Sequence, residues 1–129
     1  MDFRELFDDW NDLQTCSAGT TVYAEGDPAE ALFVVLDGEV ELRRFGEATS
    51  TEQAGGIIGE SALLEPGLHS GSAVARTDTR LARLERQQLK KLMDGNAEFA
   101  LQIMAALAKR LRTVDAYIGA RIAADGNGN

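Results

Sequence analysis

The stretch GGIIGESALL, residues 55–64, decides the fold of this chain together with EGDP at residues 25–28. EGDP leads into the apolar run ALFVVL of residues 31–36, which ends at the turn pair Asp37-Gly38. In the longer stretch, two short apolar pieces are separated by Gly-Glu-Ser. Short apolar runs that end in glycine turns are typical of the strands of a β-sandwich or a β-roll.

The same pattern continues on both sides of these stretches, over residues 15–85. Further strands are predicted at residues 20–24, 39–45, 72–76 and 81–85. The Asp37-Gly38 pair predicts a tight hairpin that joins the strand before it to the strand after it. We therefore expect a mainly β fold, a jelly-roll-like β-roll.

Helical spacing flanks this β-rich region at both ends. Residues 2–13 carry apolar side chains at three- and four-residue intervals, which predicts a short amphipathic helix. After about Arg86 the helical spacing returns, with a short helix that ends at residues 94–96 and a long helix over residues 97–123. We expect a single domain over residues 1–123 and a disordered tail at residues 124–129.

The long helix has two apolar faces. Phe99, Ile103 and Ala106 are expected to face the body of the domain. The other face follows the alternating three- and four-residue steps of a heptad seam, formed by Met104, Leu107, Leu111, Val114 and Ile118. Two interpretations stay open, because this seam can pack along its own roll or pair with a second copy in a homodimer.

Composition restricts the classes of partner. The net charge of the 129 residues is -8, which argues against general nucleic-acid binding because such binding neutralises phosphates with Lys and Arg. The sequence has no run of about 18 apolar residues that would insert in a membrane, and its acidic N-terminus is not a secretory signal. The single Cys16 fits a reducing cytoplasm, where we expect the protein to be located.

Three features in order resemble the cyclic nucleotide-binding domain shared by bacterial catabolite activator proteins, regulatory subunits of cAMP-dependent kinase and cyclic nucleotide-gated channels. They are EGDP with the strand after it, GGIIGESALL, and residues 72–84 followed by two helices. The resemblance covers roughly residues 13–115 and implies a β-roll that binds a cyclic nucleotide. The activator proteins carry a DNA-binding unit after the long helix, but only 11 residues follow Ile118. We expect no DNA binding by this chain alone.

The resemblance implies that residues 59–64 open a phosphate-binding cassette. Backbone N–H groups at the start of its short helix, from Gly59, Glu60, Ser61 and Ala62, are then expected to face the ligand phosphate. The Glu60 carboxylate is implied to accept a hydrogen bond from the ribose 2′-hydroxyl. The alternative is that Glu60 only occupies the first turn of a helix, where acidic residues are favoured.

The cassette departs from the family pattern at His69, where the family usually has an arginine that holds the phosphate. A guanidinium offers a fixed fork of donors and a permanent charge, whereas a neutral imidazole offers one donor. Three interpretations stay open: a weaker phosphate ligand that strengthens on protonation, a pocket for another small anion, or a domain without ligand. Ser70 remains a candidate ligand-binding residue. The cations nearest in sequence are Arg43, Arg44, Arg76 and Arg80.

The sequence contains no catalytic constellation and no His/Cys metal cluster, since it has one histidine and one cysteine. We expect a non-enzymatic regulatory module that needs no cofactor and senses cAMP, cGMP or a related small anion. The alternative is a scaffold of the same fold that dimerises or binds a protein partner without a ligand.

Overall fold

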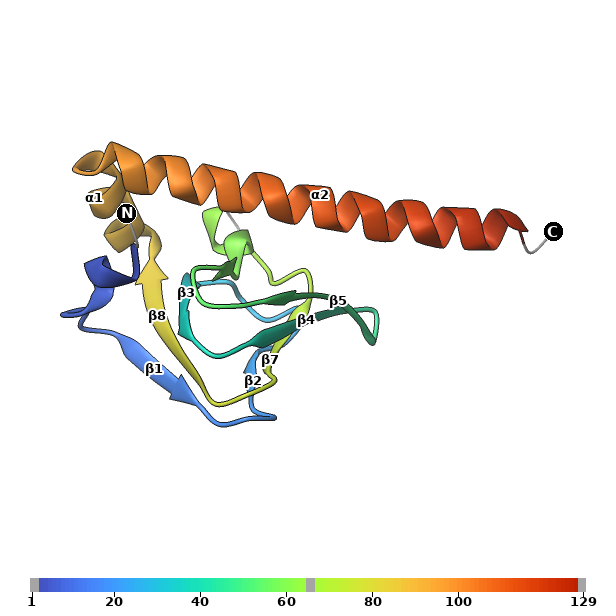
Figure 1. Cartoon of the computed structure of the whole chain (residues 1–129), viewed down its shortest axis with the longest axis horizontal. Coiled ribbons are helices and arrows are strands. Elements are labelled where there is room, and N and C mark those ends of the chain that lie inside the picture. The colour runs from blue at the N-terminus through green and yellow to red at the C-terminus, as the bar shows by residue number, and fades with distance from the viewer. Residues whose placement is uncertain (1–2, 65–66, 128–129) are drawn as a thin grey trace.

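The computed structural model describes residues 3–64 and 67–127 and contains two four-stranded antiparallel sheets, with the helices on one side (Figure 1). The strand orders are β1-β8-β3-β6 and β2-β7-β4-β5. The elements are η1 (Phe3–Phe7), β1 (Leu13–Cys16), β2 (Thr21–Tyr23), β3 (Ala31–Asp37), β4 (Val40–Arg44), β5 (Glu47–Glu52), β6 (Ile57–Ile58), η2 (Glu60–Leu63), β7 (Ser72–Ala75), β8 (Thr79–Glu85), α1 (Arg86–Asp94) and α2 (Ala97–Asn127). The predicted mainly β roll with flanking helices is confirmed.

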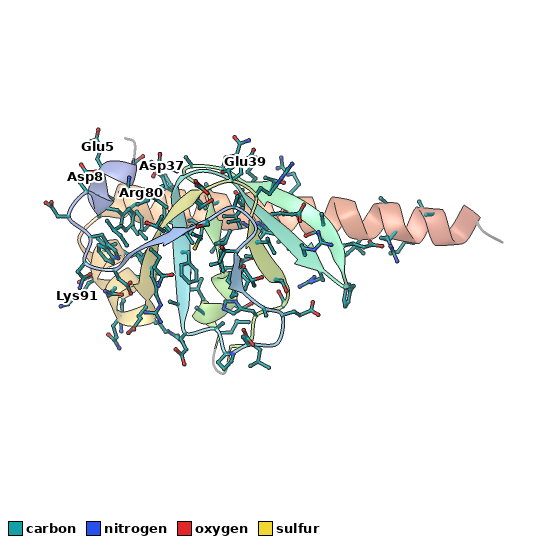
Figure 2. All side chains as sticks on the ribbon, turned by 90° about the horizontal axis from the view of Figure 1, so that it is seen from below. Glu5, Asp8, Asp37, Glu39, Arg80 and Lys91 are labelled. Atoms are coloured by element: carbon teal, nitrogen blue, oxygen red, sulfur yellow. The ribbon has the colours of Figure 1, made fainter. Side chains whose placement is uncertain are left out.

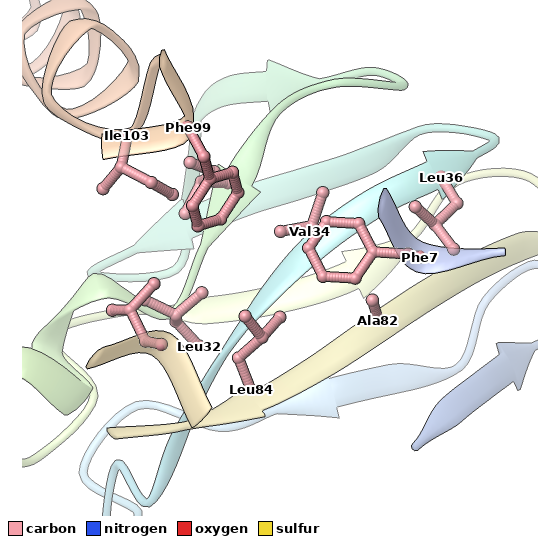
Figure 3. Close-up of a cluster of buried hydrophobic side chains, with 10 residues drawn as sticks. Phe7, Leu32, Val34, Leu36, Ala82, Leu84, Phe99 and Ile103 are labelled. Carbon is pink, nitrogen blue, oxygen red and sulfur yellow. The ribbon is translucent and has the colours of Figure 1, made fainter. Parts of the chain in front are cut away.

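Strand β3 is buried on both faces and separates two hydrophobic clusters. Successive side chains of a strand point to opposite faces of the sheet. Leu32 and Val34 accordingly pack toward the helices, with Phe7, Phe99 and Ile103, as Figure 3 shows. The intervening residues of β3 pack between the two sheets, in a cluster formed by Phe33, Val35, Val40, Leu42, Ile58, Ala73 and Leu81. This double burial explains why the strand is a continuous apolar run.

The predicted hairpin between β3 and β4 is wrong, because these strands belong to different sheets. The Asp37-Gly38 turn takes the chain from one sheet to the other. Gly38 has a φ of 90°, and a Cβ there would lie 2.4 Å from the Asp78 carbonyl oxygen. The tight hairpin forms instead between β4 and β5, where Phe45 and Gly46 both have positive φ.

The strands that were not predicted are β1, β5 and β6, and each lies at the edge of its sheet. Strand β5 has the sequence EATSTE, with no apolar alternation, and lies at the edge of its sheet.

At the N-terminus, only a short 3₁₀-helix forms over Phe3–Phe7 in place of the predicted helix at residues 2–13. Trp10, which follows this helix, donates its indole N–H to the Arg83 carbonyl oxygen at 2.8 Å. That contact lets the next residues enter β1 beside β8.

Exposed ion pairs lie at the strand ends. Arg80 of β8 contacts Asp37 of β3 at 3.0 Å, and Figure 2 shows the two side chains close together. Both side chains are more than half exposed, so the pair contributes little to stability. Arg80 was one of the cations near the cassette in sequence, but it lies on this surface and does not line the smaller cavity described below.

The long helix confirms one predicted face and changes the other. Phe99 and Ile103 are buried, as expected, whereas Leu107 packs partly against the same core and leaves the predicted seam. The exposed apolar row consists of Leu101, Met104, Leu111, Ile118 and Ile122, and the Val114 side chain lies outside the described residues. Helix α2 continues to Asn127, so residues 124–127 extend it where a tail was expected. No helix in the described part of the chain is long and apolar enough to cross a membrane.

Candidate functional site

The turn that begins at Gly59 brings the predicted cassette against the first sheet. Strand β6 pairs with β3 through Ile58 and Phe33, and Gly59 then reverses the chain with a φ of 77°. A Cβ on Gly59 would lie 3.2 Å from the Ala31 carbonyl oxygen, so this close approach favours glycine. The predicted cassette helix is a single 3₁₀ turn, η2, which has Glu60 as its first residue.

A cavity of about 70 Å³ lies against this turn. Five of the predicted site residues line it: Gly59, Glu60, Ser61, His69 and Ser70. The sixth, Ala62, is buried and does not line the cavity. The Leu68 side chain is exposed and leaves the cavity unfilled. The structure thus gathers residues that lie ten positions apart around one small space.

His69 is buried by an aromatic stack. Its ring centroid lies 3.8 Å from that of Tyr23, with an interplanar angle of 11°. The backbone is fixed as well, because the His69 N–H donates to Asp27 at 2.9 Å and the His69 carbonyl accepts from Gly26 at 2.8 Å. Burial lowers the pKa of His69 from its usual 6.5, against the opposing charges of Asp27 and Glu60. The ring is therefore neutral at pH 7, which weighs against a charged His69 as the anion ligand.

Tyr23 forms the other half of this stack. Burial raises the pKa of its phenol far above the usual value, and the nearby Glu60 carboxylate adds to the effect. The Arg110 charge and a hydrogen bond with the Gly59 backbone act in the opposite direction. The phenol therefore stays protonated, and the Tyr23–His69 stack is an uncharged wall of the cavity.

Arg110 of α2 is, like Tyr23, a site residue that the sequence did not predict. Its Nη1 donates to both Glu60 carboxylate oxygens at 3.2 Å, and its Nη2 donates to the Ile57 carbonyl oxygen. Its Nε and Nη2 lie 3.2 and 2.9 Å from Glu52 Oε1. The residue is only 9% exposed. A signal existed, because position 110 follows Ile103 by seven residues and so continues the face that packs on the roll.

A second, larger cavity of about 440 Å³ lies between α2 and the loop that follows β5. Its walls include Ala106 and Lys109 of the helix and Gly56 of the loop. Arg110 lines this cavity and the 70 Å³ cavity, and it is therefore part of the wall between them.

Two arginines of strand β4 line the smaller cavity. Arg43 and Arg44 line the cavity together with Arg110, and Glu60 is the carboxylate among the lining residues. Arg43 donates to Glu41 and to the Gly46 carbonyl oxygen, each at 2.7 Å. Arg110 is paired with Glu52 and Glu60, and Arg43 with Glu41, so Arg44 is the lining arginine that has no carboxylate partner within the described residues.

Metal ligation has little support in the same region. Within residues 3–64 and 67–127, no group of three or more His, Cys, Asp or Glu side chains is arranged to hold a metal ion.

Residues 13–96 match the family model described as the cyclic nucleotide-binding domain. The chain is 28% identical over 99 residues to a CRP-like cAMP-activated global transcriptional regulator of Mycobacterium tuberculosis, covering 73% of this chain and 44% of that protein. It is 36% identical over 102 residues to the cyclic AMP receptor protein of Thermus thermophilus, covering 75% and 47%. The crystal structure of the Thermus thermophilus catabolite activator protein superposes with a TM-score of 0.70 at 32% identity, covering 84% of this chain and 53% of that one. This chain thus spans about half the length of these relatives.

Proposed function

The chain belongs to the cyclic nucleotide-binding domain family, and from this premise we propose that it is a non-enzymatic regulatory module that senses a cyclic nucleotide. The observation that supports the proposal is the small cavity lined by the Glu60 carboxylate and by Arg44, an arginine without a carboxylate partner among the described residues. A cyclic nucleotide has one negative charge on its phosphate and one free ribose hydroxyl. The guanidinium groups suit the first, and a carboxylate acceptor suits the second.

Ligand binding is coupled to α2 through the Arg110–Glu60 ion pair. A 2′-hydroxyl that donates to Glu60 competes with Arg110 for the same carboxylate oxygens. The 70 Å³ cavity is also far smaller than the roughly 300–1,000 Å³ of typical ligand pockets. Movement of Arg110 would join it to the neighbouring 440 Å³ cavity. The ligand enters between the cassette and α2 and selects an arrangement in which the helix has shifted.

The test is calorimetric titration of the protein with cAMP, cGMP and 2′-deoxy-cAMP. We expect a cyclic nucleotide to bind and loss of the 2′-hydroxyl to weaken binding by about tenfold or more, because hydrogen bonds to charged groups contribute about 1.5–3 kcal/mol. In Glu60→Gln the difference between cAMP and its deoxy analogue should shrink. The absence of heat with cAMP and cGMP up to millimolar concentration, from protein shown to be folded, would overturn the proposal.

A second candidate function is a dimerisation or protein-interaction scaffold, for which the exposed apolar row of α2 is the supporting observation. The row advances in steps of three, seven, seven and four residues, a pattern that suits a helix–helix seam. In this case a second copy of the chain would cover Leu111 at the middle of the row. Light scattering of Leu111→Asp tests it: we expect the change to convert dimer to monomer, and a wild-type monomer at all concentrations would exclude the homodimer.

A further inference from the structure

Arg44, the last residue of β4, lines the smaller cavity with a guanidinium that is only partly hydrogen-bonded within the described residues. Its Nε donates to the Ser70 carbonyl oxygen at 3.2 Å. Within the described residues, its two terminal nitrogens make no hydrogen bond or ion pair, and its other neighbour is the Phe45 ring, 6.0 Å from Cζ. The side chain is half-buried and lines the cavity, where a bidentate partner can reach the two terminal nitrogens.

The other two arginines at this cavity are already committed. Arg43 donates from both terminal nitrogens, to Glu41 and to the Gly46 carbonyl oxygen. Arg110 donates from all three of its nitrogens, to two carboxylates and to the Ile57 carbonyl oxygen. A new anion would have to compete with these contacts for the N–H groups of either residue. It would have to compete with none at the Arg44 fork.

The sheet register places Arg44 beside the loop that carries His69. Arg43 of β4 pairs with Ser72 of β7, so the antiparallel pairing sets Arg44 against Gly71. A Cβ on Gly71 would lie 2.4 Å from the Arg43 carbonyl oxygen, and only glycine lets this loop pack so closely on β4. The Arg44–Ser70 hydrogen bond forms at the same contact. Strand β4 and the loop at residues 70–71 are thus held together, and the Arg44 guanidinium lies next to this loop.

We propose that Arg44 holds the anionic group of the ligand, in place of an arginine at position 69. The group is a singly charged phosphodiester, as in a cyclic phosphate, and it accepts two parallel N–H bonds from the terminal nitrogens of Arg44. This inference rests on the proposed function for the identity of the whole ligand. The anion subsite itself depends only on the contacts around Arg44.

With Arg44 as the anion ligand, the cassette needs no arginine at position 69. An arginine at position 69 would reach the anion from the cassette loop, whereas Arg44 reaches it from the neighbouring sheet. His69 then serves a different purpose, because its stack on Tyr23 gives the cavity an uncharged wall. The permanent positive charge comes from β4, so anion binding by Arg44 needs no protonation of the imidazole.

Calorimetry with cAMP and cGMP on Arg44→Gln, Arg44→Lys and Arg80→Gln tests this assignment. Arg80→Gln is the matched control, because it removes the same charge from an exposed arginine outside the cavity. We expect Arg44→Gln to weaken binding by about tenfold to a hundredfold, since it loses charge-assisted bonds. Arg44→Lys should fall between Arg44→Gln and wild type, because it keeps the charge and loses the fork, and Arg80→Gln should bind like wild type.

Dimethyl phosphate, a phosphodiester without ribose or base, separates this inference from the proposed function. In the wild-type protein, millimolar dimethyl phosphate should shift the NMR signals of the Arg44 side-chain Nε–H and the Ser70 and Gly71 amides. If the cyclic nucleotides bind and Arg44→Gln binds them like wild type, the Arg44 assignment is overturned and the proposed function stands. If they fail to bind but dimethyl phosphate still shifts these signals, the function is overturned and the anion subsite stands. If neither binds, both are overturned.

Discussion

Replacement of Arg110 by methionine should destabilise the free protein and tighten ligand binding. Methionine keeps most of the length of the side chain but leaves the carboxylates of Glu52 and Glu60 without their guanidinium partner. Removal of one partner from a fully buried ion pair costs about 3–5 kcal/mol. Here the two carboxylate side chains retain 18% and 34% of their exposure, so water compensates for part of the loss. We expect a loss of about 2–3 kcal/mol, or roughly 10 °C in Tm for a domain of this size.

The effect on ligand affinity has the opposite sign. If the ligand must displace Arg110 from Glu60, then Arg110→Met removes a contact that only the free state makes. Affinity for cAMP should rise, and the Tm increase caused by saturating cAMP should be larger in the variant than in wild type. Urea unfolding and thermal scans with and without ligand measure both effects. Arg112→Met is the matched control, because it makes the same change on the exposed face of the same helix.

Two results would refute this reasoning. An unfolding free energy equal to that of wild type and Arg112→Met would show that the Arg110 contacts contribute no net stability. Weaker cAMP binding in Arg110→Met, from folded protein, would show that Arg110 supports the bound state instead of competing with it. The double variant with Glu60→Gln adds a check, since removal of the unpaired carboxylate should recover part of the lost stability.

Two further predictions concern pH and a glycine. Burial lowers the pKa of His69, so the unfolded chain binds more protons than the folded one as the pH falls toward and below about 6.5. The free energy of unfolding, measured with urea, should therefore fall between pH 7.5 and 5.5. In His69→Phe it should fall less. An equal fall in both proteins would assign the effect to other groups. Gly38→Ala should cost well over 1 kcal/mol, because it combines a positive φ with a Cβ contact at 2.4 Å, whereas Gly46→Ala has the strain without the contact and should cost about 1 kcal/mol. Equal losses would contradict the steric part of this argument.

Apolar patterning predicted the elements that the core contains, because burial selects the residues of those elements directly. Strand β3 and the Phe99–Ile103 face of α2 are examples, and both are buried. Strand β5 was missed because an edge strand of polar residues leaves no such pattern. The hairpin prediction failed for another reason: Asp37-Gly38 specifies a sharp turn, but local turn chemistry does not specify which strand becomes the partner.

Site residues within one sequence motif were predicted, whereas those that only the fold brings together were not. The glycines and Glu60 were found because a motif carries them along one continuous segment. Arg110 was missed because its role depends on contacts across 50 residues or more, with Glu60 and Glu52. Arg44 could be named from the sequence as a nearby cation, but its position at the cavity follows from the β4–β7 register, which only the folded sheet defines.

The C-terminal end of helix α2 extends past the roll, as Figure 1 shows. The 17 residues between Arg110 and the end of the helix at Asn127 correspond to an arm of about 25 Å, at about 1.5 Å per residue. A tilt of about 10° at Arg110 would displace the far end by roughly 4 Å. The exposed pair of Arg121 with Glu47 restrains the arm only weakly. If the ligand displaces Arg110 from Glu60 as proposed, this geometry would convert a change of partner at one carboxylate into a displacement of the far end of the helix.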